Sequence, residues 1–170
     1  MIYFYGDPHF GSEDIRRYEN RPFKDIYTMD AELIENYNKI ITDEDTVFFT
    51  GDFCEDGYER EILADLNGKK YLIKGNHDTK PNSIYRDFGF IEVYDHPIIL
   101  DNFWIVSHEP MYITEMAPYA NIFAHVHNNP MYKTYSQRSF CTCVDRNDFK
   151  PVSFDCIKKS VAEAAICEYL

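Results

Sequence analysis

Five short segments of the chain end an apolar run with side chains that commonly bind metal ions. The segments are YFYGDPH, VFFTGD, LIKGNHD, WIVSH and IFAHVH, and their polar residues are Asp7, His9, Asp52, Asn76, His77, Asp78, His108, His125 and His127. Imidazole with carboxylate, without organised thiolates, suits borderline and harder divalent ions such as manganese, iron and zinc. The sequence therefore predicts a metal site built from the ends of strands.

Each segment has an ordinary interpretation when it is taken alone. In the GNHD segment, Asn76 and Asp78 could hydrogen-bond their own backbone in a turn while His77 faces solvent. A strand that runs into glycine can instead deliver polar residues to the carboxyl edge of a sheet, where α/β folds bind ligands. Because the pattern occurs at five strand ends of one short chain, a shared site is favoured over five unrelated turns.

The spacing within two of the segments supports such a site. Asp7 and His9 are two positions apart, and so are His125 and His127. In an extended chain, side chains two positions apart project to the same side, so Asp7 and His9 would face the same site. Two cations held roughly 3.5 to 4 Å apart, as in two-metal phosphoryl-transfer sites, need a negatively charged bridging oxygen. A single aspartate can supply that oxygen.

Strands and helices alternate in the first part of the chain. The predicted strands are rich in β-branched and aromatic residues, and they cover residues 2–5, 46–50, 71–74, 98–100, 103–107, 121–124, 139–144 and 151–154. Between the first three strands, Leu33, Tyr37 and Ile40 recur at helical spacing behind Thr28 as the expected N-cap, and GYEREILADLNG ends in an Asn-Gly helix stop. This order predicts a βαβαβ beginning.

The second half of the chain changes character. The stretch IILDNFWIVSH predicts two strands joined by a hairpin at Asp101-Asn102. A closing helix is expected over residues 155–169, with Ile157 and Val161 on its apolar face. The whole order is typical of an α/β fold in which two packed mixed β-sheets are flanked by helices.

Composition and charge limit the class of protein. The 170 residues are 45% hydrophobic and no Gly/Ser/Pro-rich linker divides them, which suits one domain over residues 1–170. Lys and Arg number 17 against 29 Asp and Glu, a formal net charge of -12, so the average surface repels polyanions. Extended nucleic acid is therefore not an expected partner.

The sequence also bears on the compartment. The start MIYFYGD lacks a basic segment followed by a long apolar core, and no run reaches the roughly 18 apolar residues of a membrane span. Five cysteines at irregular spacing fit a reducing compartment, so a soluble cytoplasmic protein without a membrane partner is expected. Cys141 and Cys143 share one face of a predicted strand, which leaves a metal or redox role open beside ordinary packing.

The ordered motifs resemble those of the calcineurin-like metallophosphoesterases. They are Asp7-x-His9, Gly51-Asp52, Gly75-Asn76-His77-Asp78, His108 and His125-x-His127. The segments NRPF, LIENYNKIITDEDTVFFTGDF and VDRNDFKPVSFD are similar to the small single-domain prokaryotic and phage-type phosphoesterases of this superfamily. The resemblance covers nearly the whole chain, and it implies a four-layer αββα sandwich and a metal-dependent phosphoric ester hydrolase, a phosphodiesterase or phosphatase.

The resemblance also implies a role for each motif residue. The first metal ion would be held by Asp7, His9, Asp52 and His127. The second would be held by Asp52, Asn76, His108 and His125, which makes Asp52 the bridge. His77 would protonate the leaving oxygen, and Asp78 would orient the ring of His77. The implied cofactors are two divalent metal ions, with Mn2+ expected first and Fe, Zn, Ni or Mg as alternatives.

The expected reaction is in-line attack of a metal-activated hydroxide on phosphorus, without a covalent protein intermediate. The expected substrate is a small phosphorylated metabolite or a nucleotide. The residues leave phosphomonoesters and phosphodiesters both open, and they do not specify the oligomeric state.

Two residues depart from the family pattern, and three arginines follow the first motif. Ala124 precedes His125 where the family commonly has glycine, and Ser12 stands where close relatives often carry histidine. Arg16, Arg17 and Arg21 could approach a phosphate, but surface ion pairs with the acidic residues around them are the favoured interpretation.

Two further classes of function remain as alternatives. The same superfamily includes a trafficking subunit that uses its altered site as a protein interface, so a non-catalytic binding module is one alternative. The filled set of seven ligand positions and His77 favours an enzyme. A nuclease is the other, and the charge of -12 argues against it.

Overall fold

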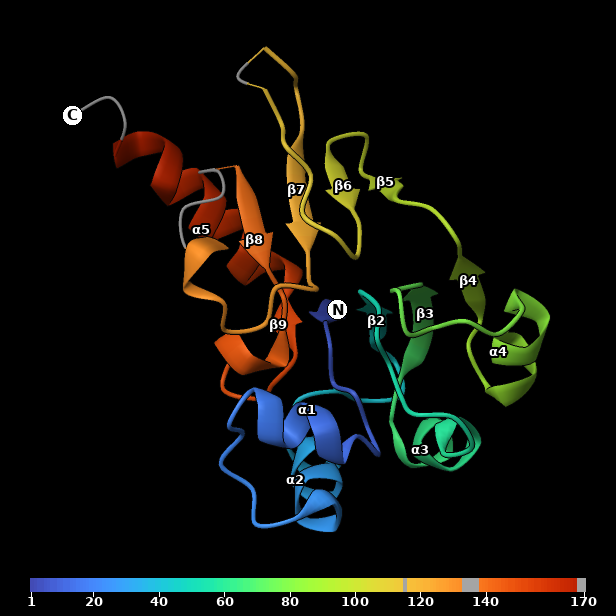
Figure 1. Ribbon diagram of the computed structural model, residues 1–170. Coiled ribbons are helices and arrows are strands. Elements are labelled where there is room, and N and C mark those ends of the chain that lie inside the picture. Colours follow the sequence, from blue (N-terminus) through green and yellow to red (C-terminus); the bar gives the residue numbers. More distant parts are fainter. Residues whose placement is uncertain (115, 133–137, 168–170) are drawn as a thin grey trace.

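The computed structural model describes residues 1–114, 116–132 and 138–167, which form two β-sheets with flanking helices (Figure 1). The larger sheet has the strand order β4-β3-β2-β1-β9. Its strands are β1 (Ile2–Tyr5), β2 (Thr46–Phe49), β3 (Lys69–Ile73), β4 (Glu92–Tyr94) and β9 (Val152–Ser153). The first four are parallel to one another, whereas β9 is antiparallel to β1. All four parallel strands therefore end at the same edge.

The smaller sheet has the order β5-β6-β7-β8. Its strands are β5 (Ile98–Leu100), β6 (Trp104–Val106), β7 (Ala120–Phe123) and β8 (Ser139–Cys141). The expected hairpin joins the antiparallel strands β5 and β6, while β6, β7 and β8 are parallel. Asp101 and Asn102 both have left-handed backbone, with φ of 52° and 56°, as a tight hairpin turn requires.

The helices cover the sheets on two sides. They are α1 (Glu13–Tyr18), α2 (Ile26–Asn38), α3 (Glu59–Asp65), α4 (Asn82–Phe88) and α5 (Phe154–Cys167), with two 3-10 turns, η1 (Pro130–Tyr132) and η2 (Val144–Arg146). Figure 1 shows α5 beside β8, and α5 also contacts β9 and β1. Two mixed sheets with flanking helices are thus confirmed as the fold. None of the helices in the described part of the chain combines the length and apolar character needed to cross a bilayer.

The predicted cap of α2 is wrong. Asp25, not Thr28, is the N-cap, because its backbone is extended and its carboxylate accepts hydrogen bonds from the amide and the hydroxyl of Thr28 at 2.9 and 2.8 Å. The helix therefore begins at Ile26, one turn earlier than its apolar pattern indicates. An aspartate satisfies the free amides of the first turn.

Besides the two 3-10 turns, three short elements were not predicted from the sequence: α1, α4 and β4. Each has seven residues or fewer, which is too short to show a repeating apolar pattern. The strand predicted over residues 139–144 is also shorter, since Val144 begins a 3-10 turn. Similarly, Phe154 begins α5 rather than ending a strand.

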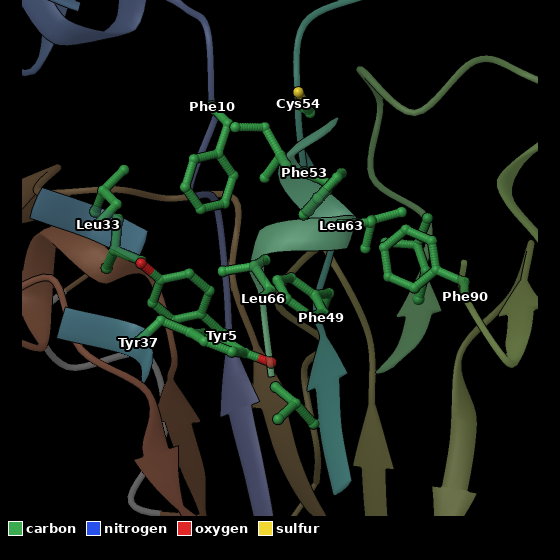
Figure 2. Packing of buried hydrophobic residues seen from close by; sticks show 14 of the residues in the cluster. Tyr5, Phe10, Leu33, Tyr37, Phe49, Phe53, Cys54, Leu63, Leu66 and Phe90 are labelled. Atoms are coloured by element: carbon green, nitrogen blue, oxygen red, sulfur yellow. The ribbon is translucent and has the colours of Figure 1, made fainter. Parts of the chain in front are cut away.

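Alternation along the central strands gives the larger sheet two apolar faces. Tyr5 and Phe49 face α2 and α3, where they pack with Tyr37 and Phe53 (Figure 2). Phe4, one position from Tyr5, faces the other way and packs with residues of the smaller sheet and of α5. Successive side chains of a strand point to opposite faces, so one run of aromatic residues anchors both layers.

The apolar core between the larger sheet and helices α2 and α3 should contribute most to the free energy of unfolding. Leu33 is fully buried between α2 and the sheet, whereas Ile99 in β5 is 56% exposed. We expect Leu33→Ala to lower the free energy of unfolding by about 2 to 5 kcal/mol, because it removes contacts and leaves a cavity. Ile99→Ala should change it by about 0.5 kcal/mol or less. Urea denaturation measures both, and equal losses would contradict this assignment of the core.

Candidate metal centre

The carboxyl ends of β1, β2 and β3 meet the carboxyl ends of β6 and β7 where the two sheets join. The junction is a parallel bridge in which the Gly6 amide donates to the Thr142 carbonyl at 3.1 Å and the Val144 amide donates to the Gly6 carbonyl at 2.9 Å. The hydroxyls of Thr50 and Thr142 lie 2.8 Å apart across it. The five predicted segments all follow these strand ends, so one junction positions them together.

Six of the predicted ligands form two groups in which nitrogen and oxygen atoms lie within 4.8 Å of one another. The first group is Asp7, His9 and His127, and the second is Asp52, His108 and His125. A seventh predicted ligand, Asn76, joins the second group, because its Oδ1 lies 3.1 Å from Nε2 of His108.

Two atoms of the first group are buried without a hydrogen-bond partner. Oδ2 of Asp7 accepts from the His125 amide and from the thiol of Cys143, both at 2.7 Å, whereas its Oδ1 has no partner. Nε2 of His9 is likewise buried and unpartnered. Unsatisfied buried polar atoms are costly and uncommon in native proteins. A divalent cation would satisfy both, so these residues fit a metal ion.

The electrostatics of His9 also suit a ligand. Burial, together with the positive neighbours His127 and Arg21, lowers the pKa of His9 to about 2. The ring is therefore neutral at ordinary pH and offers a lone pair. Burial raises the pKa of Asp7, which marks a carboxylate whose charge is poorly compensated by the protein alone. A bound cation would supply that compensation.

In the second group, a backbone carbonyl determines the tautomer of His108. Nδ1 of His108 lies 2.8 Å from the Thr50 carbonyl oxygen, which can only accept, so Nδ1 carries the hydrogen. The other ring nitrogen, Nε2, faces Oδ1 of Asn76 at 3.1 Å and Nδ1 of His125 at 2.9 Å. Electron-rich atoms converge here as well, and the hydrogen bond to the carbonyl orients the ring as in known metal sites.

Asp52 links the two groups through one oxygen. Its Oδ2 lies 3.5 Å from Nε2 of His9 and 3.5 Å from Nε2 of His108. Its other oxygen, Oδ1, accepts from the His77 amide at 2.8 Å. A single carboxylate oxygen is thus equidistant from ring nitrogens of both groups, the position that a bridge between two cations requires.

The expectation that Asp7 and His9 meet in an extended chain is wrong. Five predicted ligands have left-handed backbone, with φ of 51° at Asp7, 48° at His9, 51° at Asp52, 69° at His125 and 43° at His127. Strands β1 and β7 end before these residues, and turns then bring the side chains together. Such backbone costs about 1 to 3 kcal/mol per residue and is characteristic of functional sites.

Two glycines give the ligands room. A Cβ atom at Gly51, whose φ is 99°, would lie 2.3 Å from Nδ1 of His108, and one at Gly75 would lie 2.2 Å from Oδ1 of Asp52. Any larger residue at either position would displace a predicted ligand. The glycine that precedes Asp52 and the glycine that precedes Asn76 are therefore part of the site.

The structure corrects the role expected for Asp78. Its carboxylate accepts hydrogen bonds from the amides of Asp52, Gly75 and Phe53 at 2.8, 2.9 and 3.1 Å. Among the described residues, no hydrogen bond joins Asp78 to the ring of His77, so Asp78 holds the Asp52 turn instead of orienting that ring. Burial raises the pKa of Asp78 to about 6. The His77 ring is exposed and lies edge-on to His9, with centroids 5.1 Å apart.

The two departures from the family pattern are accommodated. Ala124 is fully buried and packs with Val126 and Cys143. Its amide donates to the His108 carbonyl at 2.8 Å, and its φ is not left-handed, so alanine fits where glycine is common. Ser12 is the N-cap of α1 and accepts from the Ile15 amide at 3.4 Å.

The surface ion pairs expected for the arginines are correct for two of the three. Arg16 and Arg17 pair with Glu13 at 2.6 and 2.8 Å. Arg21 is buried and pairs with Asp145 at 2.8 Å, with both side chains inaccessible to solvent. Asp145 lies 124 positions further along the chain, so no local pattern could indicate this pair.

Cys141 and Cys143 are free thiols whose sulfur atoms lie 3.2 Å apart. Neither belongs to the two groups of potential metal ligands in the described residues. The thiol of Cys143 instead donates to Oδ2 of Asp7 and helps to fix that carboxylate.

Comparison with known proteins identifies the family. Residues 1–151 match the model of the family described as calcineurin-like phosphoesterase. The chain belongs to the calcineurin-like phosphoesterase family.

Two relatives of this calcineurin-like phosphoesterase extend the similarity to nearly the full chain. An uncharacterised protein of Methanocaldococcus jannaschii is 30% identical over 177 residues, which cover 97% of this chain and 93% of the relative. The crystal structure of a protein of unknown function from Aquifex aeolicus is 29% identical with a TM-score of 0.74, and the match covers 94% of this chain and 98% of that one. The predicted family and fold are thereby confirmed.

The three amide hydrogen bonds that Asp78 accepts should stabilise the fold and the turn at Asp52. Asp78→Asn replaces an accepting oxygen with an NH2 group that faces a backbone amide, so we expect the free energy of unfolding to fall by about 1 to 3 kcal/mol. Affinity for Mn2+ should fall too, because the Asp52 turn loses its support. Denaturation and calorimetric titration measure these effects, with the exposed Asp87→Asn as matched control. Unchanged stability and affinity, with turnover lost only for poor leaving groups, would restore the ring-orienting role.

Proposed function

We propose that this protein is a dinuclear metal-dependent phosphoesterase that hydrolyses phosphodiester or phosphomonoester bonds of a small phosphorylated substrate. The observation that carries the proposal is the position of Oδ2 of Asp52, 3.5 Å from Nε2 of both His9 and His108. Membership of the calcineurin-like phosphoesterase family supports hydrolysis as the reaction class.

The two groups divide the ligands between two cations. The first cation would be held by Asp7, His9, Asp52 and His127. The second would be held by Asp52, Asn76, His108 and His125. Imidazole, carboxylate and amide ligands suit Mn2+, with Fe, Zn, Ni or Mg as alternatives. When bound, two such cations lower the pKa of a water molecule and neutralise the oxygens of a phosphate ester.

His77 is the residue proposed to handle the leaving group. Its amide is fixed by Oδ1 of Asp52, while its ring is exposed beside His9. The ring can therefore reach a substrate held at the centre without belonging to either ligand group. A protonated imidazole there would donate its proton to the departing oxygen, which is general acid catalysis.

Two cavities open beside the centre and offer room for the organic part of a substrate. One, of about 360 Å³, is lined in part by Asn76 and His108, and the other, of about 540 Å³, in part by His125 and His127. Their sizes suit small molecules. The net charge of -12 is unfavourable for a long polyanion, which supports a nucleotide or phosphorylated metabolite.

Hydrolysis of two matched esters tests the proposed function. Metal-free protein resupplied with Mn2+ should cleave bis-p-nitrophenyl phosphate, p-nitrophenyl phosphate or both, and the preferred ester identifies the class. Asp52→Asn should lower kcat by at least about 100-fold, because the neutral amide cannot bridge two cations. Folded, metal-loaded protein that cleaves neither ester would favour the non-catalytic binding module.

The role of His77 is tested by varying the leaving group. His77→Ala should reduce hydrolysis of phenyl esters by about 100- to 10,000-fold, the range of general acid catalysis. Hydrolysis of p-nitrophenyl esters should fall much less, because nitrophenolate leaves without a proton. Tyr27→Ala is a suitable control, since Tyr27 is an exposed ring on α2 that lines neither cavity. Equal losses for both esters would refute the assignment of His77 as general acid.

A further inference from the structure

A buried arginine connects parts of the first ligand group that lie far apart in the sequence. Arg21 follows α1, and its guanidinium donates from Nη1 to the Pro8 carbonyl at 2.7 Å and from Nη2 to the Asp7 carbonyl at 2.8 Å. The same guanidinium donates from Nε and Nη2 to the two oxygens of Asp145 at 2.8 and 2.9 Å. One side chain therefore contacts the backbone of the first ligand turn and a carboxylate near the other end of the chain.

Asp145 in turn sets the orientation of His127. Its Oδ2 lies 2.9 Å from Nδ1 of His127, and because a carboxylate accepts, Nδ1 carries a hydrogen, which leaves Nε2 as the ring nitrogen that could bind a cation. The backbone of His127 is held separately, since Nε of Arg146 donates to the His127 carbonyl. Without Asp145, the turn would stay in place while the ring could rotate or change its tautomer.

Stability alone does not account for this buried ion pair. Both side chains are inaccessible to solvent, and removing two charges from water costs free energy that their attraction often does not recover. Apolar residues of similar volume would commonly be as stable or more stable. What they could not supply is an acceptor for His127 and two donors for the turn at Asp7 and Pro8.

We propose that Arg21 and Asp145 are positioning residues for the first cation of the proposed dinuclear site. The inference rests on the proposed function. The pair holds the ligand turn through the carbonyls of Asp7 and Pro8 and orients His127 through its ring, so one ion pair supports both sequence segments of the first ligand group.

The second ligand group has its own support, which makes the expected effect selective. His108 is oriented by the Thr50 carbonyl at 2.8 Å, and the turn at Asp52 is held by Asp78. Neither support contacts Arg21 or Asp145. Loss of the ion pair should therefore weaken the first cation and leave the second in place.

Mn2+ binding, measured by native mass spectrometry and calorimetric titration without substrate, tests the proposal. Arg21→Lys keeps the positive charge but loses the planar guanidinium group and its several N–H donors. We expect it to lower the affinity for the first Mn2+ by about 10- to 100-fold, as loss of supporting contacts does in other metal sites. His127→Ala and His108→Ala serve as references that show the binding curve of each group impaired alone. The Arg21→Lys curve should match that of His127→Ala.

The double variant Arg21→Met with Asp145→Leu separates positioning from stability. It removes both charges and refills the volume, so it should unfold near the temperature of the unchanged protein and still bind the first Mn2+ at least 10-fold more weakly. The surface variant Arg86→Met, which breaks the exposed pair with Glu92, should bind both ions normally. A stable double variant with two tightly bound Mn2+ ions would overturn the proposal, and if it does not fold, the Arg21→Lys result decides.

The outcomes also distinguish this inference from the proposed function. If the unchanged protein binds no divalent ion, the proposed dinuclear site fails. If it binds two and Arg21→Lys binds both as tightly, or loses both equally, only the positioning role fails.

Discussion

The constraint on which the site depends is the mutual repulsion of electron-rich atoms that the fold holds together away from water. Oδ1 of Asp7 and Nε2 of His9 are buried without partners, and Oδ2 of Asp52 lies 3.5 Å from Nε2 of His9 and of His108. Each unsatisfied buried polar group costs about 1 to 3 kcal/mol. Divalent cations would convert these repulsions into attractions. The free energy of metal binding is therefore coupled to the stability of the local fold.

Positioning these atoms requires backbone that most residues avoid, and the surrounding structure holds it in place. The left-handed turn at Asp52 lies between Gly51 and the Asp78 carboxylate, which accepts its amide. The left-handed turn at Asp7 is held by Arg21. Strain of this kind persists only where neighbouring contacts determine the conformation. Contacts within the protein therefore position the proposed ligands, as tight metal sites require.

The sequence predicted that these side chains lie close together, because the pattern is local: a β-branched or aromatic run followed by Asp, His or Asn marks the end of a strand. The same local reading missed α4 and β4, which are too short for periodicity, and placed the start of α2 at Thr28 instead of Asp25. It treated Arg21 as a surface residue and gave Asp145 no role, because their contact joins positions 124 apart. The sequence also assigned Asp78 the role of orienting the His77 ring. Only the folded chain shows that the oxygens of Asp78 face the amides of Asp52 and Phe53.

The central claim is that Asp52 bridges two cations, and anomalous X-ray diffraction from crystals soaked in Mn2+ tests it most directly. The account predicts two manganese peaks roughly 3.5 to 4 Å apart, with Oδ2 of Asp52 between them, one peak beside Asp7, His9 and His127 and the other beside Asn76, His108 and His125. A single peak at saturating Mn2+, or two peaks without a shared oxygen of Asp52, would contradict it.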